Sequence, residues 1–236
     1  MAAPSAAGRV LSPRPEWLLA AATAALVGFH YFVRADAVGV RGRGAVWFPL
    51  TGPVLSPLAH FSGAALLLGI VPVVLARLVW RMPLGSLGLG LGCRRRGLAW
   101  LALGVPLAVI AGAMGAGSTA VRAVYPLDPT LSAAAGPFLA HTLAQFLYFA
   151  AWEVLFRGVL LFGLRQRLGD GPANLVQTAL SVTAHFGRPL DETLAALPAG
   201  LLFGAVDLRI GSVWYVAMVH WVVGVSLDWF ILHHAA

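Results

Sequence analysis

The sequence has few charged residues and only one cysteine. Charged side chains make up 11% of its 236 residues and hydrophobic ones 59%, and the mean hydropathy is +0.83. A soluble domain would carry about 25% charge, so the composition excludes that class and predicts one membrane-embedded domain over residues 1–236. Because Cys93 stands alone, an intrachain disulfide and a cysteine-based metal site are also excluded.

Lysine is absent, and all 16 basic residues are arginines. They are spread over the termini and connections, so the net charge of +7 does not indicate a nucleic-acid partner. In a membrane protein, arginines indicate orientation, because cytoplasmic loops are enriched in positive charge. Most of them fall near the N-terminus and in residues 81–96, 165–170 and 207–212, which we expect to be cytoplasmic. The composition is typical of a high-GC coding sequence and favours the plasma (inner) membrane of a bacterium.

Long apolar runs predict an all-α fold, a polytopic membrane helix bundle with about seven to eight transmembrane helices. A helix needs about 20 apolar residues to cross a bilayer. The expected helices are residues 16–33, 60–80, 97–116, 137–164, 172–186, 191–206 and 213–232. Residues 46–58 contain three prolines and predict a re-entrant or kinked piece. We expect the first helix to be retained, rather than cleaved as a signal peptide, and residues 207–212 to form a turn.

Two charges interrupt the apolar run at 137–164. One charged side chain near the bilayer centre costs about 2.5–3.5 kcal/mol on insertion scales. Glu153 and Arg157 are four residues apart, so on a helix they share a face and can pair. An ion pair at this depth predicts a functional site. The alternative is that Arg157 only neutralises Glu153 and fixes helix packing.

Polar residues recur on two further helices. Asn174, Thr178, Ser181 and His185 are spaced to lie on one face of the helix at 172–186, which should therefore face the bundle interior. The helix at 213–232 carries His220 near its middle. Asp228 follows two turns later, and we expect it to be an end-of-helix charge.

Three helices thus each present an ionisable group, namely Glu153, His185 and His220. One carboxylate with two imidazoles can activate water. The carboxylate would serve as general base, and the imidazoles would hold the water or donate to the developing oxyanion. This reading needs no cofactor. The alternative is a zinc ion bound by the same three side chains, although no HExxH motif is present.

Three separated motifs resemble the CPBP family of intramembrane proteases, which includes the type II CAAX prenyl endopeptidases and the bacteriocin-processing or self-immunity proteins. The motifs are residues 153–158 with Glu153 and Arg157, then His185, then residues 200–214 followed by His220. The resemblance covers residues 138–230 and predicts a catalytic core at 137–232. It implies about eight crossings and cleavage of a peptide bond near the bilayer. The substrate would be a membrane-anchored or secreted peptide, and Arg157 and Trp152 would support the site.

The chain departs from the family pattern at three positions. The family's first motif opens with two adjacent glutamates, whereas here Trp152 precedes Glu153. Ser181 stands where the second motif has phenylalanine, and Gly224 where the third has asparagine. Two functions follow. One is an endopeptidase that uses Glu153, and the other is a catalytically inactive scaffold or immunity protein that binds a partner in the same cavity. A small transporter is disfavoured because the sequence shows no internal repeat and no paired broken helices.

Overall fold

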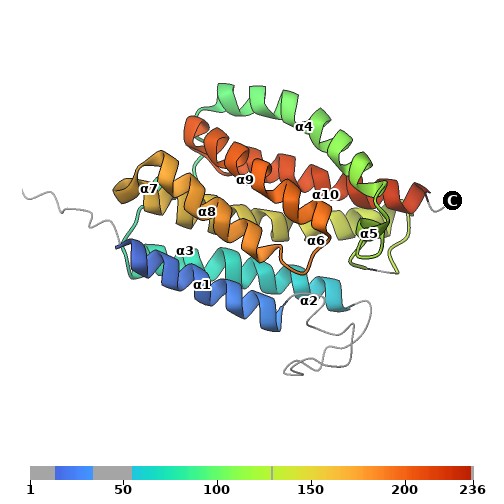
Figure 1. Cartoon of the computed structure of the whole chain (residues 1–236), viewed down its shortest axis with the longest axis horizontal. Coiled ribbons are helices and arrows are strands. Elements are labelled where there is room, and N and C mark those ends of the chain that lie inside the picture. Colours follow the sequence, from blue (N-terminus) through green and yellow to red (C-terminus); the bar gives the residue numbers. More distant parts are fainter. Residues whose placement is uncertain (1–13, 34–54, 129, 235–236) are drawn as a thin grey trace, which may run out of the picture.

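A computed structural model of the chain describes residues 14–33, 55–128 and 130–234, and every regular element within them is a helix (Figure 1). The predicted all-α bundle is therefore confirmed. Five stretches of the described chain are long and apolar enough to cross a membrane: Pro57–Leu78, Arg94–Ala116, Ala135–Leu168, Leu190–Ile210 and Trp214–His233. The helices expected at 16–33 and 172–186 are present but are not among these five.

Several elements run directly into one another and form longer helices. In chain order the elements are α1 Pro15–Phe32, α2 Leu55–Ala64, η1 Ala65–Ile70, α3 Val71–Leu78, η2 Leu84–Leu87, α4 Arg94–Ala116, α5 Thr119–Arg122, α6 Ala135–Glu153, η3 Val154–Phe162, α7 Gly163–Leu168, α8 Asp170–Ala184, α9 Leu190–Ile210 and α10 Trp214–His234. Here η1 and η3 are π-helices, while η2 is a 3₁₀ turn. Thus α2, η1 and α3 form one rod, and α6, η3 and α7 form another.

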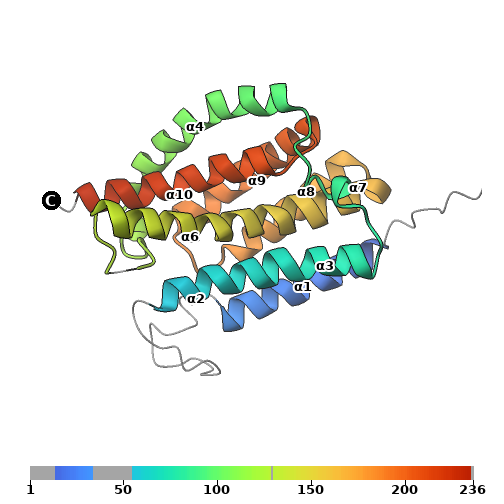
Figure 2. The same cartoon turned by 180° about the vertical axis from the view of Figure 1, so that it is seen from behind.

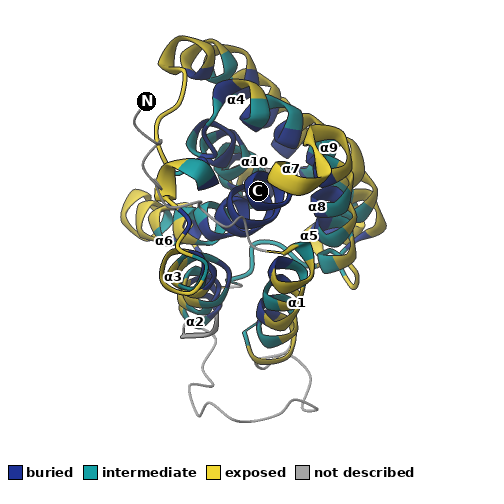
Figure 3. Cartoon of the chain, turned by 90° about the vertical axis from the view of Figure 1, so that its left-hand side faces the viewer, coloured by how far each residue is buried: buried dark blue, intermediate teal, exposed yellow. Residues whose placement is uncertain are grey.

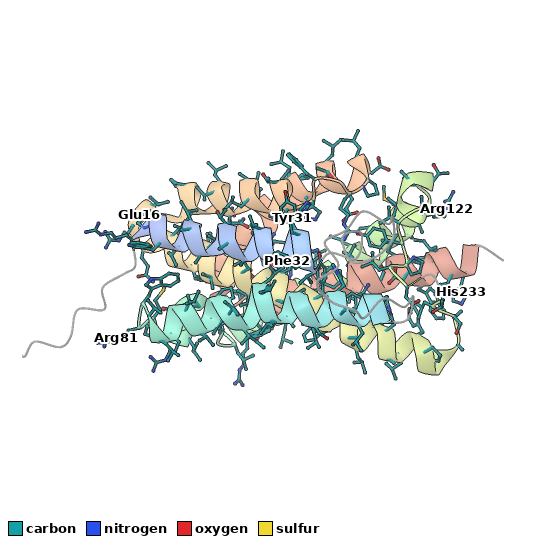
Figure 4. All side chains as sticks on the ribbon, turned by 90° about the horizontal axis from the view of Figure 1, so that it is seen from below. Glu16, Tyr31, Phe32, Arg81, Arg122 and His233 are labelled. Atoms are coloured by element: carbon teal, nitrogen blue, oxygen red, sulfur yellow. The ribbon has the colours of Figure 1, made fainter. Side chains whose placement is uncertain are left out.

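The two ends of the bundle differ in charge. Glu16 at the start of α1 and Arg81 after α3 lie at one end, whereas Arg122 and His233 lie at the other (Figure 4). Because the long helices run back and forth between these ends (Figure 1), the start of α4 with its three arginines joins the Arg81 end. The structure therefore places the start of α1 and residues 81–96 at the same end, which matches the side that the arginine pattern assigned to residues 81–96. We call it the arginine-rich end.

The rod formed by α6, η3 and α7 passes through the middle of the bundle (Figure 2). In the apolar 18-residue stretch of this rod, 78% of the residues are buried. The corresponding share in the other four candidate spans is 22–39%. The π-helix η3 is buried along its whole length, and the outward faces of the surrounding helices are exposed (Figure 3). The outer helices thus present their apolar faces to lipid, and the central rod supplies the core.

Three expected boundaries differ from the structure. Residues 207–210 were expected in a turn, but they form the last turn of α9, which ends where Gly211 adopts φ of +78°. Asp207 therefore lies on a helix and is fully buried. The helix α4 begins at Arg94 rather than at residue 97, because the arginines form its first turn. Most of the proline-rich piece expected at 46–58 lies outside the described residues, and α2 begins at Leu55.

Candidate functional site

The ion pair expected on the central rod is present. Glu153 ends α6 and Arg157 lies in the π-helix η3, with exposed side-chain fractions of 0% and 2%. The Nη1 atom of Arg157 lies 3.2 Å from both carboxylate oxygens and donates a hydrogen bond to Oε1. π-Helical turns are rare and occur frequently at functional sites. The two charges are thus joined inside the protein, away from solvent and lipid.

His220 on α10 contacts the same carboxylate. Its Nδ1 lies 2.6 Å from Oε1 of Glu153, and its ring packs against Phe149 and Phe203 at centroid distances of 4.6 and 5.6 Å. A carboxylate accepts hydrogen bonds, so Nδ1 is the donor, and a neutral ring keeps its lone pair on Nε2. The side chain is 22% exposed. Glu153 and the two aromatic rings therefore fix the orientation of a partly open imidazole.

His185 reaches the site because α8 is short. A helix of 15 residues spans about 22 Å, less than the roughly 30 Å hydrocarbon core, so its C-cap residue His185 lies within the bundle. The Nδ1 of His185 donates to the backbone oxygen of Ser181 at 2.7 Å, which again leaves the lone pair of a neutral ring on Nε2. Ser181 thus supports the site through its carbonyl. Trp152 packs edge-on against the His185 ring at 5.1 Å.

Both histidines line one small cavity. Its volume is about 60 Å³, which is room for roughly four water molecules. Its walls are Phe61, Tyr125, Leu127, Gln145, Tyr148, Phe149, Trp152, His185, Arg188 and His220. Glu153 is not part of the wall and lies behind His220. Of the three predicted catalytic residues, the structure thus brings two imidazoles to the cavity and places the carboxylate one hydrogen bond away.

One side of the cavity is formed by connecting segments. Tyr125 and Leu127 follow α5, and Arg188 lies between α8 and α9, with its guanidinium 5.7 Å from the centre of the Tyr125 ring. The Tyr125 hydroxyl donates to Glu192 at 2.9 Å. Burial raises the pKa of Tyr125 well above its ordinary value, so the phenol stays neutral and remains a donor. These contacts tie the segment after α5 to the start of α9 beside the cavity.

Asp228 is not the end-of-helix charge that the sequence suggested. It is 1% exposed, because α10 continues to His234 and α6 packs over it. Its Oδ2 accepts from Nε2 of Gln145 at 2.9 Å and lies 3.2 Å from Nε2 of His141. The sequence analysis did not single out Gln145. The available signal was the spacing of His141, Gln145 and Trp152 at intervals of four and seven residues, which places them on one face of α6.

The polar stripe on α8 mainly packs α8 against α9. Asn174 donates to the backbone oxygen of Leu201 at 3.0 Å, and Gln177 donates to that of Gly200 at 3.1 Å. Gly204 has no side chain to collide with the amide of Asn174. The stripe therefore faces the bundle interior, as expected, but only His185 from it reaches the cavity.

A second acidic residue lies near the ion pair. Asp207 is 0% exposed, and neither carboxylate oxygen has a hydrogen-bond partner among the described residues. One turn earlier on α9, the ring of Phe203 lies 5.6 Å from the guanidinium of Arg157. Within the described part of the chain, no group of three or more His, Cys, Asp or Glu side chains is placed to hold a metal ion. The Oε1 of Glu153 is instead occupied by His220.

One comparison with known families gives a match, and it covers the part of the chain that holds this site. The family model described as type II CAAX prenyl endopeptidase, Rce1-like, matches residues 134–226. No curated protein and no solved structure matches the chain. The matched segment contains Glu153, Arg157, His185 and His220, and it differs by only four residues at each end from the range that carries the resemblance. The chain is an integral membrane protein, and its residues 134–226 match the Rce1-like family, which is consistent with a member of the CPBP family.

Proposed function

We propose that this protein is an intramembrane endopeptidase in which Glu153 and His220 together activate a water molecule. The observation that carries the proposal is the 2.6 Å contact between Nδ1 of His220 and Oε1 of Glu153, beside a cavity that His220 shares with His185. A buried carboxylate that fixes the tautomer of an imidazole also stabilises the imidazolium formed when the ring takes a proton. The carboxylate therefore acts through His220, rather than directly on water.

The two imidazoles suit the same water molecule. In their neutral forms both present the Nε2 lone pair, so one water can donate a hydrogen bond to each ring and keep its own lone pair for attack. His220 then takes one proton from this water as its oxygen bonds to the peptide carbon. It later returns the proton to the departing amine. Arg188 lines the cavity and supplies the positive charge that stabilises the oxyanion.

The substrate we propose is a membrane-anchored or secreted peptide. Five aromatic residues line the cavity, namely Phe61, Tyr125, Tyr148, Phe149 and Trp152, which suits apolar side chains. Tyr125 and Arg188 belong to connections at the Arg122 end, opposite the arginine-rich end. Because cytoplasmic loops carry the excess of arginine, the cavity would open toward the non-cytoplasmic side of a bacterial plasma membrane.

One observation favours the second candidate function, peptide binding without cleavage. Trp152 occupies the position of the family's first glutamate, and its indole packs against His185 at 5.1 Å. A cavity built in this way still holds a peptide, but it presents no carboxylate directly to water. A binding protein of this kind would act as a scaffold or as an immunity protein.

The deciding experiment uses purified protein in liposomes with a library of quenched fluorescent hydrophobic peptides. The variants are Glu153→Gln, His185→Gln, His220→Gln and the triple combination. Because the three side chains act as one unit, each single variant should lose nearly as much activity as the triple. The matched control is His233→Gln, which changes an exposed histidine on the helix that carries His220. This variant should retain activity.

The outcomes separate the two functions. Normal turnover by His220→Gln or Glu153→Gln would refute the proposed mechanism. Peptide binding by the intact protein without any cleavage would establish the binding function instead. We propose that no metal takes part, so a chelator such as 1,10-phenanthroline should leave the rate unchanged. Loss of activity on chelation with recovery on adding zinc would reverse that assignment.

A further inference from the structure

Gln145 is a polar cavity residue that the proposed mechanism leaves unused. It is 5% exposed and lies on α6, one turn before Phe149. It shares the cavity wall with His185 and His220. A buried amide in an apolar membrane bundle is costly unless its hydrogen-bonding groups are satisfied.

The orientation of the Gln145 amide is set by Asp228. A carboxylate oxygen accepts, so the group 2.9 Å from Oδ2 of Asp228 is the NH₂ group, and Oε1 points the other way. The Nε2 atom of His141 lies 3.2 Å from the same Oδ2. The Oε1 of Gln145 is buried and has no hydrogen-bond partner among the described residues. The NH₂ group also keeps a second N–H beyond the one given to Asp228.

The packing around Gln145 holds it in place. A Cβ atom at Gly224 of α10 would lie 2.6 Å from the Phe149 ring and 3.2 Å from Nε2 of Gln145. The glycine therefore lets α6 approach α10 closely enough for Gln145 to reach Asp228. Asp228 and His141 are themselves buried, so they can fix the amide but cannot contact a peptide in the cavity.

We propose that Gln145 binds the backbone of the substrate through a peptide group next to the scissile bond. A side-chain amide that offers one acceptor and one donor pairs with a peptide group, which offers one N–H and one carbonyl. Oε1 of Gln145 accepts from the substrate N–H, and this contact registers the peptide against His185 and His220. Asp228 acts as a positioning residue that keeps Oε1 directed at the substrate. This inference rests on the proposed function for its substrate class, but not on cleavage.

Ester substitution tests the inference one peptide bond at a time. Short labelled hydrophobic peptides are prepared with each backbone amide replaced in turn by an ester, which removes one N–H donor. Their binding to the full chain in detergent micelles is followed by fluorescence anisotropy, so that turnover is not required. For the intact protein, one ester position should weaken binding roughly tenfold, the upper range for a neutral hydrogen bond.

Gln145→Met removes the acceptor and keeps the length of the side chain. This variant should bind the all-amide peptide about tenfold more weakly, and it should no longer distinguish the amide from the ester at the sensitive position. Thr142→Val is the matched control, because Thr142 is equally buried on α6 but does not line the cavity. It should show the same ester profile as the intact protein. If Gln145→Met does not fold, the ester scan of the intact protein still stands alone.

The inference is wrong if no ester position weakens binding to the intact protein, or if Gln145→Met keeps the same sensitive position. Failure of every peptide to bind would also refute it. Binding with the expected ester profile, but without cleavage, would refute the endopeptidase and leave the role of Gln145 standing. Cleavage without any ester-sensitive position would refute the role of Gln145 and leave the endopeptidase standing.

Discussion

Removing one partner of the Glu153–Arg157 pair should destabilise the protein strongly. The two side chains are 0% and 2% exposed and lie 3.2 Å apart, so neither charge can be hydrated when its partner is lost. Stranding a buried charge costs about 3–5 kcal/mol. We expect Glu153→Gln to reach this range, because Nε of Arg157 already lacks a hydrogen-bond partner among the described residues.

Removing Arg157 should lower the unfolding free energy by less than removing Glu153 does. Arg157→Met leaves Glu153 hydrogen-bonded to His220, so the remaining carboxylate keeps one of its two partners. The double variant removes both charges and leaves none stranded. Its loss of unfolding free energy should therefore fall short of the sum of the single losses by about 2 kcal/mol, within the range measured for contacting residues.

The assay is reversible unfolding in mixed detergent and SDS micelles, with the unfolding free energy of four proteins compared in a double-mutant cycle. The Arg165–Asp170 pair is the control, because its side chains are 34% and 54% exposed although Nε lies only 2.8 Å from Oδ1. Solvent screening should limit that pair to less than about 1 kcal/mol. If the Glu153 and Arg157 losses add to within about 0.5 kcal/mol, the two charges are not coupled and the reasoning fails.

Three further predictions concern packing, topology and pH. Gly224→Ala should lower the unfolding free energy by about 1–3 kcal/mol through overpacking, because the added carbon would lie 2.6 Å from the Phe149 ring; unchanged stability would contradict the close approach of α6 and α10. The exposed Cys93, beside the arginines that begin α4, should react with a membrane-impermeant maleimide only in inverted vesicles; labelling from outside intact cells would reverse the assigned orientation. Burial raises the pKa of Tyr125, so ionisation opposes folding. The stability should therefore be unaffected below the ordinary tyrosine pKa of about 10 and fall above it, and Tyr125→Phe should reduce this alkaline decrease in equilibrium unfolding measurements.

The sequence by itself determined the class of fold and most of the candidate site. Continuous apolar runs of about 20 residues favour helices, because a helix of that length crosses the bilayer and satisfies all of its backbone hydrogen bonds internally. The spacing of Glu153 and Arg157 was sufficient to predict their pairing, since residues four apart on a helix are neighbours whatever surrounds them. The cost of ionisable groups in a membrane likewise predicted that His185 and His220 face the interior.

The tertiary structure decided how these residues are connected. Periodicity gives the face of a helix but not its neighbour, so the sequence could not show that Glu153 lies behind His220 instead of in the cavity. For the same reason Asp228 looked like a terminal charge, although α6 covers it and Gln145 and His141 bind it. Contacts between α6 and α10 join residues more than 60 positions apart, and they depend on the packing of whole helices, which no local pattern encodes.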